Sequence, residues 1–242
     1  MKGQTDGRPD MRTIGEWQGV IRELFSRAYG GYRCALTASS ASPLIDDLQA
    51  NFPRVDDSCY AGQFEEIERA LVDCLVDLFV ICDRLDIALD QSIAIKWPGA
   101  CFYCGMVKDC GCVGRHGAPK LDGSLRSDLL AQPLSGWQQM LKRLFGVTNQ
   151  ARGVAKVSEH LGKEIDELEE AVVRFEASRD PVDKLAAMLE CADVLAWLIA
   201  VANLLDIDLS YHLSIVYHLD RCPSCEEEIC AVQANCPFPW KV

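Results

Sequence analysis

Two pairs of acidic residues in the second half of the chain have the spacing of a metal-binding site. Glu164 and Glu167 are three residues apart, and so are Glu190 and Asp193. On a helix, this spacing places both members of a pair on one face, one turn apart. Four carboxylates on two facing helices can bind hard, oxygen-preferring cations such as Mg²⁺. The two pairs therefore predict a Mg²⁺ site built from two helices.

The second acid pair lies in an apolar segment. From Leu185 to Leu205 the polar side chains, apart from one cysteine, are Glu190, Asp193 and Asn203. A helix this apolar is expected to be buried, and a buried carboxylate is costly unless a partner compensates it. A divalent cation is one such partner, and a buried Arg or Lys is the alternative. For the first pair the alternative is a solvated helix face, because acidic runs are usually exposed.

The cysteines suggest a second kind of metal site. Eight of the 13 cysteines fall into two clusters, Cys101, Cys104, Cys110, Cys112 and Cys222, Cys225, Cys230, Cys236. The N-terminal segment has no apolar core of the kind found in a signal peptide, so clustered cysteines indicate metal binding before disulfides. Four thiolates in a short span predict a structural Zn²⁺ site in each cluster. Redox disulfides and an iron–sulfur cluster remain alternatives.

Charge and hydropathy exclude some classes of function. The 242-residue chain has a net charge of -12, with 24 basic against 36 acidic residues. This balance argues against a protein that binds a nucleic-acid duplex, which needs a basic surface. An anionic small molecule could still bind through metal ions. Residues 185–205 are long enough to span a bilayer, but two acids in the segment make insertion costly. We therefore expect a cytoplasmic protein without a membrane span.

The sequence also matches itself after a shift of 120 residues. Trp17-Gln18 falls on Trp137-Gln138, and Leu85-Asp86-Ile87 falls on Leu205-Asp206-Ile207. One inserted residue then aligns the first Cys-x-x-Cys motif with the second. Ordered matches at one fixed offset predict an internal duplication. The expected units are residues 1–113 and 127–242, joined by a Gly- and Pro-rich linker at 114–126.

Both units have the hydrophobic periodicity of helices. In the first we expect helices near 13–27, 42–51, 63–86 and 87–97, and in the second near 127–145, 151–177, 181–205 and 208–219. A break is expected near Gly146, and Asp180 with Pro181 has the pattern of a helix start. The predicted fold is all-α: two four-helix units packed as an intrachain pseudo-dimer, each ending in a small zinc knot of four cysteines. Further pairing into a homodimer is left open.

The acid pattern resembles a known superfamily. Glu-x-x-Glu, 22 intervening residues, Glu-x-x-Asp, an apolar helix and LDIDL are similar to the MazG-like all-α NTP pyrophosphohydrolases, which are related to the dimeric dUTPases and dCTP pyrophosphatases. The resemblance covers residues 137–221. It implies a four-helix core and Mg²⁺-dependent (or Mn²⁺-dependent) cleavage of an NTP or dNTP to a monophosphate and pyrophosphate. It also implies that the four acids, Glu164, Glu167, Glu190 and Asp193, are catalytic metal ligands.

The chain departs from this superfamily in two ways. At the four acid positions the first unit has Leu44, Asp47, Ala70 and Asp73, so we expect it to be a degenerate copy. Many members also carry a Lys and an Asn in the fourth helix that contact phosphate. The second unit has no Lys there, whereas the first unit has Lys96. Either the phosphate contacts have changed, or the two units share one composite site.

Two further residues are candidate substrate contacts. Trp197 shares a helix face with Glu190 and Asp193 and could stack on a base, although an aromatic at this spacing is more often part of the core. Asn203 matches a position that is often Asn or Asp in the superfamily. The alternative function is a catalytically inactive nucleotide sensor, or a helical interaction module stabilised by zinc.

Overall fold

The computed structural model describes residues 11–24, 44–51, 64–112 and 126–217. Within these residues the protein is helical and has no named strand; Thr13 and Pro133 form an isolated β-bridge. The expected all-α class is confirmed. The predicted linker lies largely outside the described residues. So does the second cysteine cluster, Cys222, Cys225, Cys230 and Cys236.

The first half of the chain, residues 11–112, contains α1 (Ile14–Leu24), a helical segment at 44–51, α4 (Phe64–Arg84) and α5 (Leu89–Lys96). Helix α1 begins with a capping box. The Glu16 backbone N–H donates to Thr13 Oγ1 at 3.1 Å, and the Thr13 N–H donates to Glu16 Oε2 at 2.7 Å. These bonds satisfy backbone donors that the helix itself leaves unpaired.

The second half, residues 126–217, contains α6 (Ser127–Leu130), α7 (Leu134–Arg152), α8 (Val154–Ser178), α9 (Pro181–Leu205) and α10 (Leu209–Val216). The predicted starts of the last two helices are confirmed. The Asp180 side chain accepts from the Val182 N–H at 2.7 Å, and the Asp208 side chain accepts from the Tyr211 N–H at 3.0 Å.

One expected boundary is wrong. The chain does not form one helix over 127–145 with a break near Gly146; the break falls before Leu134, and α7 passes through Gly146 to Arg152. Pro133 precedes Leu134 with extended backbone and lacks an N–H, so it starts a helix well but cannot continue one. The next break falls at Gly153, whose φ of 78° favours glycine.

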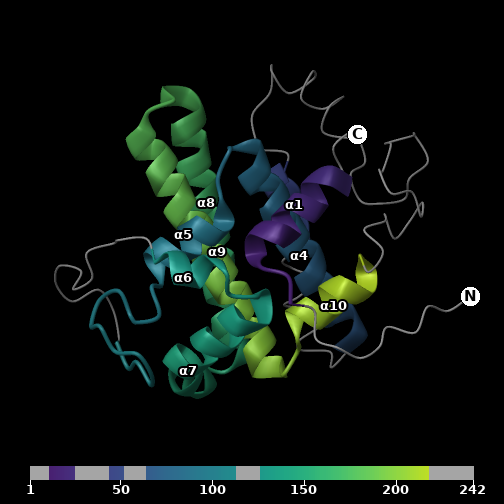
Figure 1. Ribbon diagram of the computed structural model, residues 1–242, viewed down its shortest axis with the longest axis vertical. Helices are drawn as coiled ribbons and strands as arrows, with labels where there is room; N and C mark the ends of the chain where they lie inside the picture. The colour runs from purple at the N-terminus through teal and green to yellow at the C-terminus, as the bar shows by residue number, and fades with distance from the viewer. Residues whose placement is uncertain (1–10, 25–43, 52–63, 113–125, 218–242) are drawn as a thin grey trace, which may run out of the picture.

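Helix α9 is the centre of the packing. It contacts α8, α7, α5 and α4, and it forms an antiparallel hairpin with α8 (Figure 1). Among the described helices, α9 alone has the length and apolar composition of a membrane span, but 61% of its most apolar window is buried inside the protein. Its apolar character is therefore explained by its place in the bundle core.

Matching contacts recur 120 residues apart. Gln18 Nε2 donates to the Ile87 carbonyl at 2.9 Å, while its Oε1 accepts from the Leu89 N–H at 3.2 Å. Gln138 makes the same two bonds, to the Ile207 carbonyl at 2.5 Å and from the Leu209 N–H at 3.2 Å. Each glutamine thus ties the start of a first helix to the turn before a short last helix.

The short last helices each pack on the other half. Helix α5, from the first half, packs on α9 of the second half, and α10 of the second half packs on α4 of the first. A cation near the end of α5 can therefore reach acids on α9. Because α5 and α10 each pack on the other half, the pocket described next is lined by residues of both halves.

Candidate metal-binding pocket

Three of the four predicted acids converge between α8 and α9. One carboxylate oxygen from each of Glu164, Glu190 and Asp193 lies within 4.8 Å of the other two. Asp193 is buried and the two glutamates are half-buried. Two oxygens that both bind one Mg²⁺ at about 2.0–2.1 Å are at most about 4.2 Å apart, so a small side-chain adjustment would bring this group to the spacing of a single cation. The acid triad, as we call these three residues, could hold such an ion.

Crowding of like charges changes the protonation of the acid triad. The pKa of Glu164 is raised to about 7, first by burial and then by the charges of Asp193, Glu167 and Glu190, while Lys96 opposes the shift. Burial and neighbouring negative charge both disfavour the ionised carboxyl. A bound divalent cation would relieve this repulsion, so the electrostatics suit a metal site.

Glu167 is placed differently from the other three acids. Its side chain is exposed, and it does not belong to the group of converging oxygens. Its charge still contributes to the raised pKa of Glu164. The role of Glu167 as a metal ligand stays a prediction.

Lys96 brings a positive charge from the first half of the chain. Its Nζ lies 2.6 Å from Asp193 Oδ2, and both side chains are almost buried, with 12% and 10% exposed. The alternative of a buried acid paired with a lysine is thus realised at Asp193. Even with Lys96 lowering it, the pKa of Glu164 stays raised, so like-charge repulsion within the acid triad persists beside this lysine.

Trp197 is tied to the acid triad by a hydrogen bond. Its Nε1 donates to Glu164 Oε1 at 3.1 Å. Its ring stacks on His160 at 4.8 Å between centroids, and the guanidinium of Arg152 lies 5.6 Å from the ring centroid. The indole therefore orients a triad carboxylate, and its predicted stacking on a base stays a prediction.

Sequence reasoning missed His160 and Arg152. The signal for His160 was its position four residues before Glu164, which places both on one face of α8. Arg152 ends α7, and no spacing rule connects it with residues on α9. Only the tertiary packing places it over Trp197.

Asn203 lies elsewhere. Its Nδ2 donates to the Gln138 carbonyl at 3.1 Å, and it lines a smaller hollow between α7 and α9. These contacts give no support to its tentative role in substrate binding, which stays a prediction.

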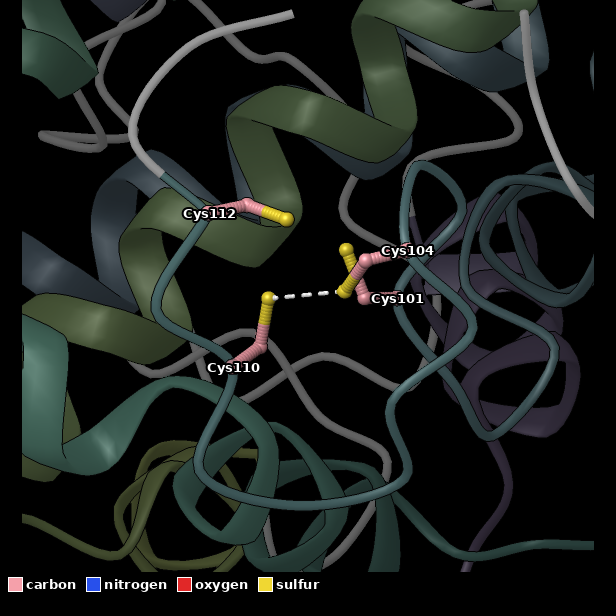
Figure 2. A group of neighbouring side chains, drawn as sticks. All are labelled: Cys101, Cys104, Cys110 and Cys112. Atoms are coloured by element: carbon pink, nitrogen blue, oxygen red, sulfur yellow. Dashed lines mark hydrogen bonds between the residues drawn. The ribbon is translucent and has the colours of Figure 1, made fainter. Parts of the chain in front are cut away.

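The first cysteine cluster forms a compact group. The sulfur atoms of Cys101, Cys104, Cys110 and Cys112 all lie within 4.8 Å of one another, and Figure 2 shows their side chains converging. The Sγ atoms of Cys104 and Cys110 are 3.5 Å apart. Four sulfurs bound tetrahedrally at about 2.3 Å lie roughly 3.8 Å apart, so the group fits a zinc ion and could hold such a metal.

The backbone helps to prepare one of these thiols for metal binding. The pKa of Cys104 is lowered to about 7, chiefly by a hydrogen bond from the Met106 backbone and then by Cys112. Burial raises the pKa of the Cys110 thiol. Metals bind the thiolate, and a cation near four sulfurs would favour ionisation of all of them.

One pocket joins the acids to the cysteines. It has a volume of about 350 Å³, and its lining includes Glu164, Asp193 and Lys96 together with Cys101 and Cys110. This volume lies in the range of small-molecule sites. Aromatic side chains complete much of the wall: Trp97, Tyr103, Phe145 and Trp197. The pocket therefore combines acids and cations with aromatic surface.

The comparisons with known proteins give no family for this chain. No protein-family model matches it, and no match was found among curated proteins or among solved structures.

Proposed function

We propose that this protein is a Mg²⁺-dependent nucleoside triphosphate pyrophosphohydrolase, which cleaves an NTP or dNTP to a monophosphate and pyrophosphate. One observation carries the proposal. Two members of the acid triad, Glu164 and Asp193, line a pocket of about 350 Å³ whose lining also includes Lys96, Arg152 and aromatic side chains. In a nucleotide hydrolase, acids can hold the metal, cations can contact phosphate oxygens, and aromatic rings can stack on the base.

The side chains have separate roles in this proposal. Glu164, Glu190 and Asp193 would hold Mg²⁺ (or Mn²⁺), which neutralises phosphate charge and lowers the pKa of a bound water. Lys96 and Arg152 are the cations that can contact phosphate oxygens. Trp197 holds Glu164 in place through its N–H. Glu167, on the exposed side of the acid triad, is available as a base to take a proton from water.

The repeated contacts support the proposed architecture of two tandem units packed as an intrachain pseudo-dimer. Gln18 and Gln138 make equivalent pairs of hydrogen bonds. Trp17 and Trp137, one residue before them, are both fully buried. The packing of α5 on α9 and of α10 on α4 is what two related units would produce by exchanging their last helices.

For the two cysteine clusters we propose that the bound metal is structural zinc. Zn²⁺ would occupy the first cluster, and a second ion would occupy Cys222, Cys225, Cys230 and Cys236. The proposed setting is the cytoplasm, with a nucleotide as partner rather than a nucleic-acid duplex or a membrane.

A nucleotide sensor without turnover is the second candidate. Two observations favour it: Glu167 lies outside the group of converging oxygens, and α10 carries no lysine. A sensor would bind Mg²⁺ and nucleotide together and release no pyrophosphate.

The test is product analysis with a panel of NTPs and dNTPs in Mg²⁺. We expect wild-type protein to release pyrophosphate and one monophosphate, and Glu190→Gln to lower the rate by roughly 100-fold or more, because a lost metal ligand costs at least as much as a lost supporting contact. Asp73→Asn is the matched control, since Asp73 occupies in the first half the position of Asp193.

The outcomes separate the two candidates. Pyrophosphate release that survives Asp73→Asn and is lost in Glu190→Gln supports the enzyme. Mg²⁺-dependent stabilisation by a nucleotide without any product supports the sensor. Product formation at equal rates in wild type and Glu190→Gln would contradict the assignment of the acid triad.

A further inference from the structure

The loop that carries the first cysteine cluster is also a wall of the pocket that contains the acid triad. Residues 101–112, which we call the cysteine loop, contribute Cys101, Tyr103, Cys110 and Cys112 to the pocket lining. The two candidate metal sites are thus neighbours across one cavity. A zinc ion bound here would stabilise the wall of the pocket, in addition to fixing the end of a helical unit.

The cysteine loop comes from the first half and is fixed to the second. The Asp109 N–H donates to the Arg143 carbonyl at 3.0 Å, and the Cys110 N–H donates to the Leu144 carbonyl at 2.7 Å. Thr148 Oγ1 donates to the Cys110 carbonyl at 2.6 Å. These bonds attach the loop to α7, on the side of the pocket that also contains Phe145.

The tip of the cysteine loop, residues 106–109, is exposed and is not held by apolar burial. It contains neither helix nor strand, and Met106 and Val107 are 49% and 67% exposed. Within the loop the Cys101 N–H donates to the Met106 carbonyl at 2.7 Å, and the Gly105 N–H donates to the Cys101 carbonyl at 2.8 Å. Zinc bound by four thiolates contributes directly to the folding energy of such a segment.

The wall beside the cysteine loop is aromatic. Trp97 and Phe145 meet edge to face, with centroids 5.2 Å apart, and Tyr103 lines the same pocket. The Nε1 of Trp97 is buried and has no hydrogen-bond partner among the described residues. Aromatic rings bind bases by stacking, so the rings of this wall are candidate contacts for a base.

Charge gives a bound nucleotide one favoured orientation. Zinc with four thiolates carries a net negative charge and would repel phosphates. Lys96 and Arg152, by contrast, are tied to the acid triad, Lys96 through Asp193 and Arg152 through Trp197. Phosphates therefore favour the acid triad once Mg²⁺ is bound, and the uncharged base is left to face the cysteine loop.

We propose that the cysteine loop, with Zn²⁺ bound, forms the surface against which the nucleobase packs, so that nucleotide affinity depends on zinc. This inference rests on the proposed function and deepens it. The loop and the acid triad come from different halves of the chain, so zinc also couples the halves at the substrate pocket.

The test compares two ligands in the full-length protein. Binding of inorganic pyrophosphate, which lacks a base, and of non-hydrolysable α,β-imido nucleoside triphosphates is measured by calorimetry in Mg²⁺. The protein is used zinc-loaded, and again after zinc removal and Mg²⁺ replacement. We expect zinc removal to weaken nucleotide binding about tenfold, within the range of one lost stacking contact, and to leave pyrophosphate binding unchanged. Metal analysis should find zinc in the loaded protein.

Variants of the cysteine loop provide a second test, which can be used if the protein unfolds when zinc is removed. Tyr103→Ala leaves all four cysteines in place, so it should keep zinc and pyrophosphate binding and lose nucleotide affinity. Val107→Ala is the matched control, because Val107 lies on the same loop and is exposed. Cys104→Ser should lose zinc and nucleotide affinity together.

Each outcome decides between the proposals. Equal weakening of both ligands, no weakening of either, or iron in place of zinc would overturn the role of the cysteine loop and leave the proposed enzyme standing. Zinc-dependent nucleotide binding without pyrophosphate release would support the proposed role of the cysteine loop and contradict the proposed enzymatic activity. A zinc-loaded protein that binds pyrophosphate but no nucleotide would overturn both.

Discussion

The two halves of the chain make the same scaffold contacts but differ in their acids. Gln18 and Gln138 hold equivalent turns with equivalent bonds, and Asp86 and Asp206, which precede those bonded turns, both have positive φ, 53° and 58°. In the second half Glu164 and Glu190 belong to the acid triad, whereas Leu44 and Ala70 occupy the matching positions in the first half and are buried in the core.

The two halves thus share their scaffold contacts although they differ in their acids, so the scaffold does not depend on the acid triad. Backbone capping and core packing are needed in both halves because both must bury apolar surface. A carboxylate cluster does not stabilise a fold by itself, because its like charges repel unless a positive charge offsets them. Where the cluster is absent, Leu44 and Ala70 fill the space with apolar side chains.

The first half nevertheless contributes to the site. Lys96 on α5 pairs with Asp193, while the position 120 residues later is Val216. The exchange of last helices delivers this cation to the acids of the other half. The first half lacks two of the four acids and supplies the lysine, so side chains of both halves line the pocket.

The largest effect should come from placing an acid in the first half. Ala70 is fully buried, and Ala70→Glu would bury a carboxyl group without a cation, which should lower the free energy of unfolding by about 3 kcal/mol or more. Glu190→Ala, the matching change in the second half, removes a charge that raises the pKa of Glu164, so it should cost the metal-free protein less stability than Ala70→Glu. Urea unfolding in a chelating buffer measures both changes.

Ala70→Met is the control for size. A loss of stability in Ala70→Met equal to that in Ala70→Glu would attribute the effect to volume. Equal destabilisation by Ala70→Glu and Glu190→Ala would remove the contrast between the halves.

The paired glutamines should give an intermediate effect that is the same in each half. Gln18→Leu and Gln138→Leu each leave a buried carbonyl and a buried N–H without their partner, and we expect each to cost about 1–3 kcal/mol of stability. Unfolding curves of the two variants measure this. A large effect in one half only would contradict the equivalence of these contacts and weaken the proposal of a duplicated unit.

Removing the shared lysine should have the smallest effect of the three. Lys96→Met keeps the aliphatic stem and removes the charge, so affinity for inorganic pyrophosphate in Mg²⁺ should fall about tenfold, as expected for one lost charge contact. Lys184→Met is the control, because Lys184 also forms a cross-half ion pair, with Asp86 at 3.1 Å. Equal losses in both variants would show a general charge effect rather than a composite site.

Much of the local structure was predictable because its causes are local. Thr13 with Glu16, Asp180 with Pro181, and Asp208 are helix starts whose bonds span only a few residues. The error at residues 131–146 came from giving Gly146 more weight than Pro133. Glycine inside a helix costs only about 1 kcal/mol, whereas proline removes a donor and clashes with the preceding turn.

The all-α class, the acids at helical spacing and the short cysteine cluster could be predicted from the sequence, because each depends on neighbours along one chain segment. Tertiary structure alone decided which groups meet. It separated Glu167 from the other three acids, brought Lys96 to Asp193 and Arg152 to Trp197, and placed the cysteine loop in the wall of the same pocket. These contacts join residues far apart in the chain, and they follow from the packing of whole helices, which spacing along the sequence does not encode.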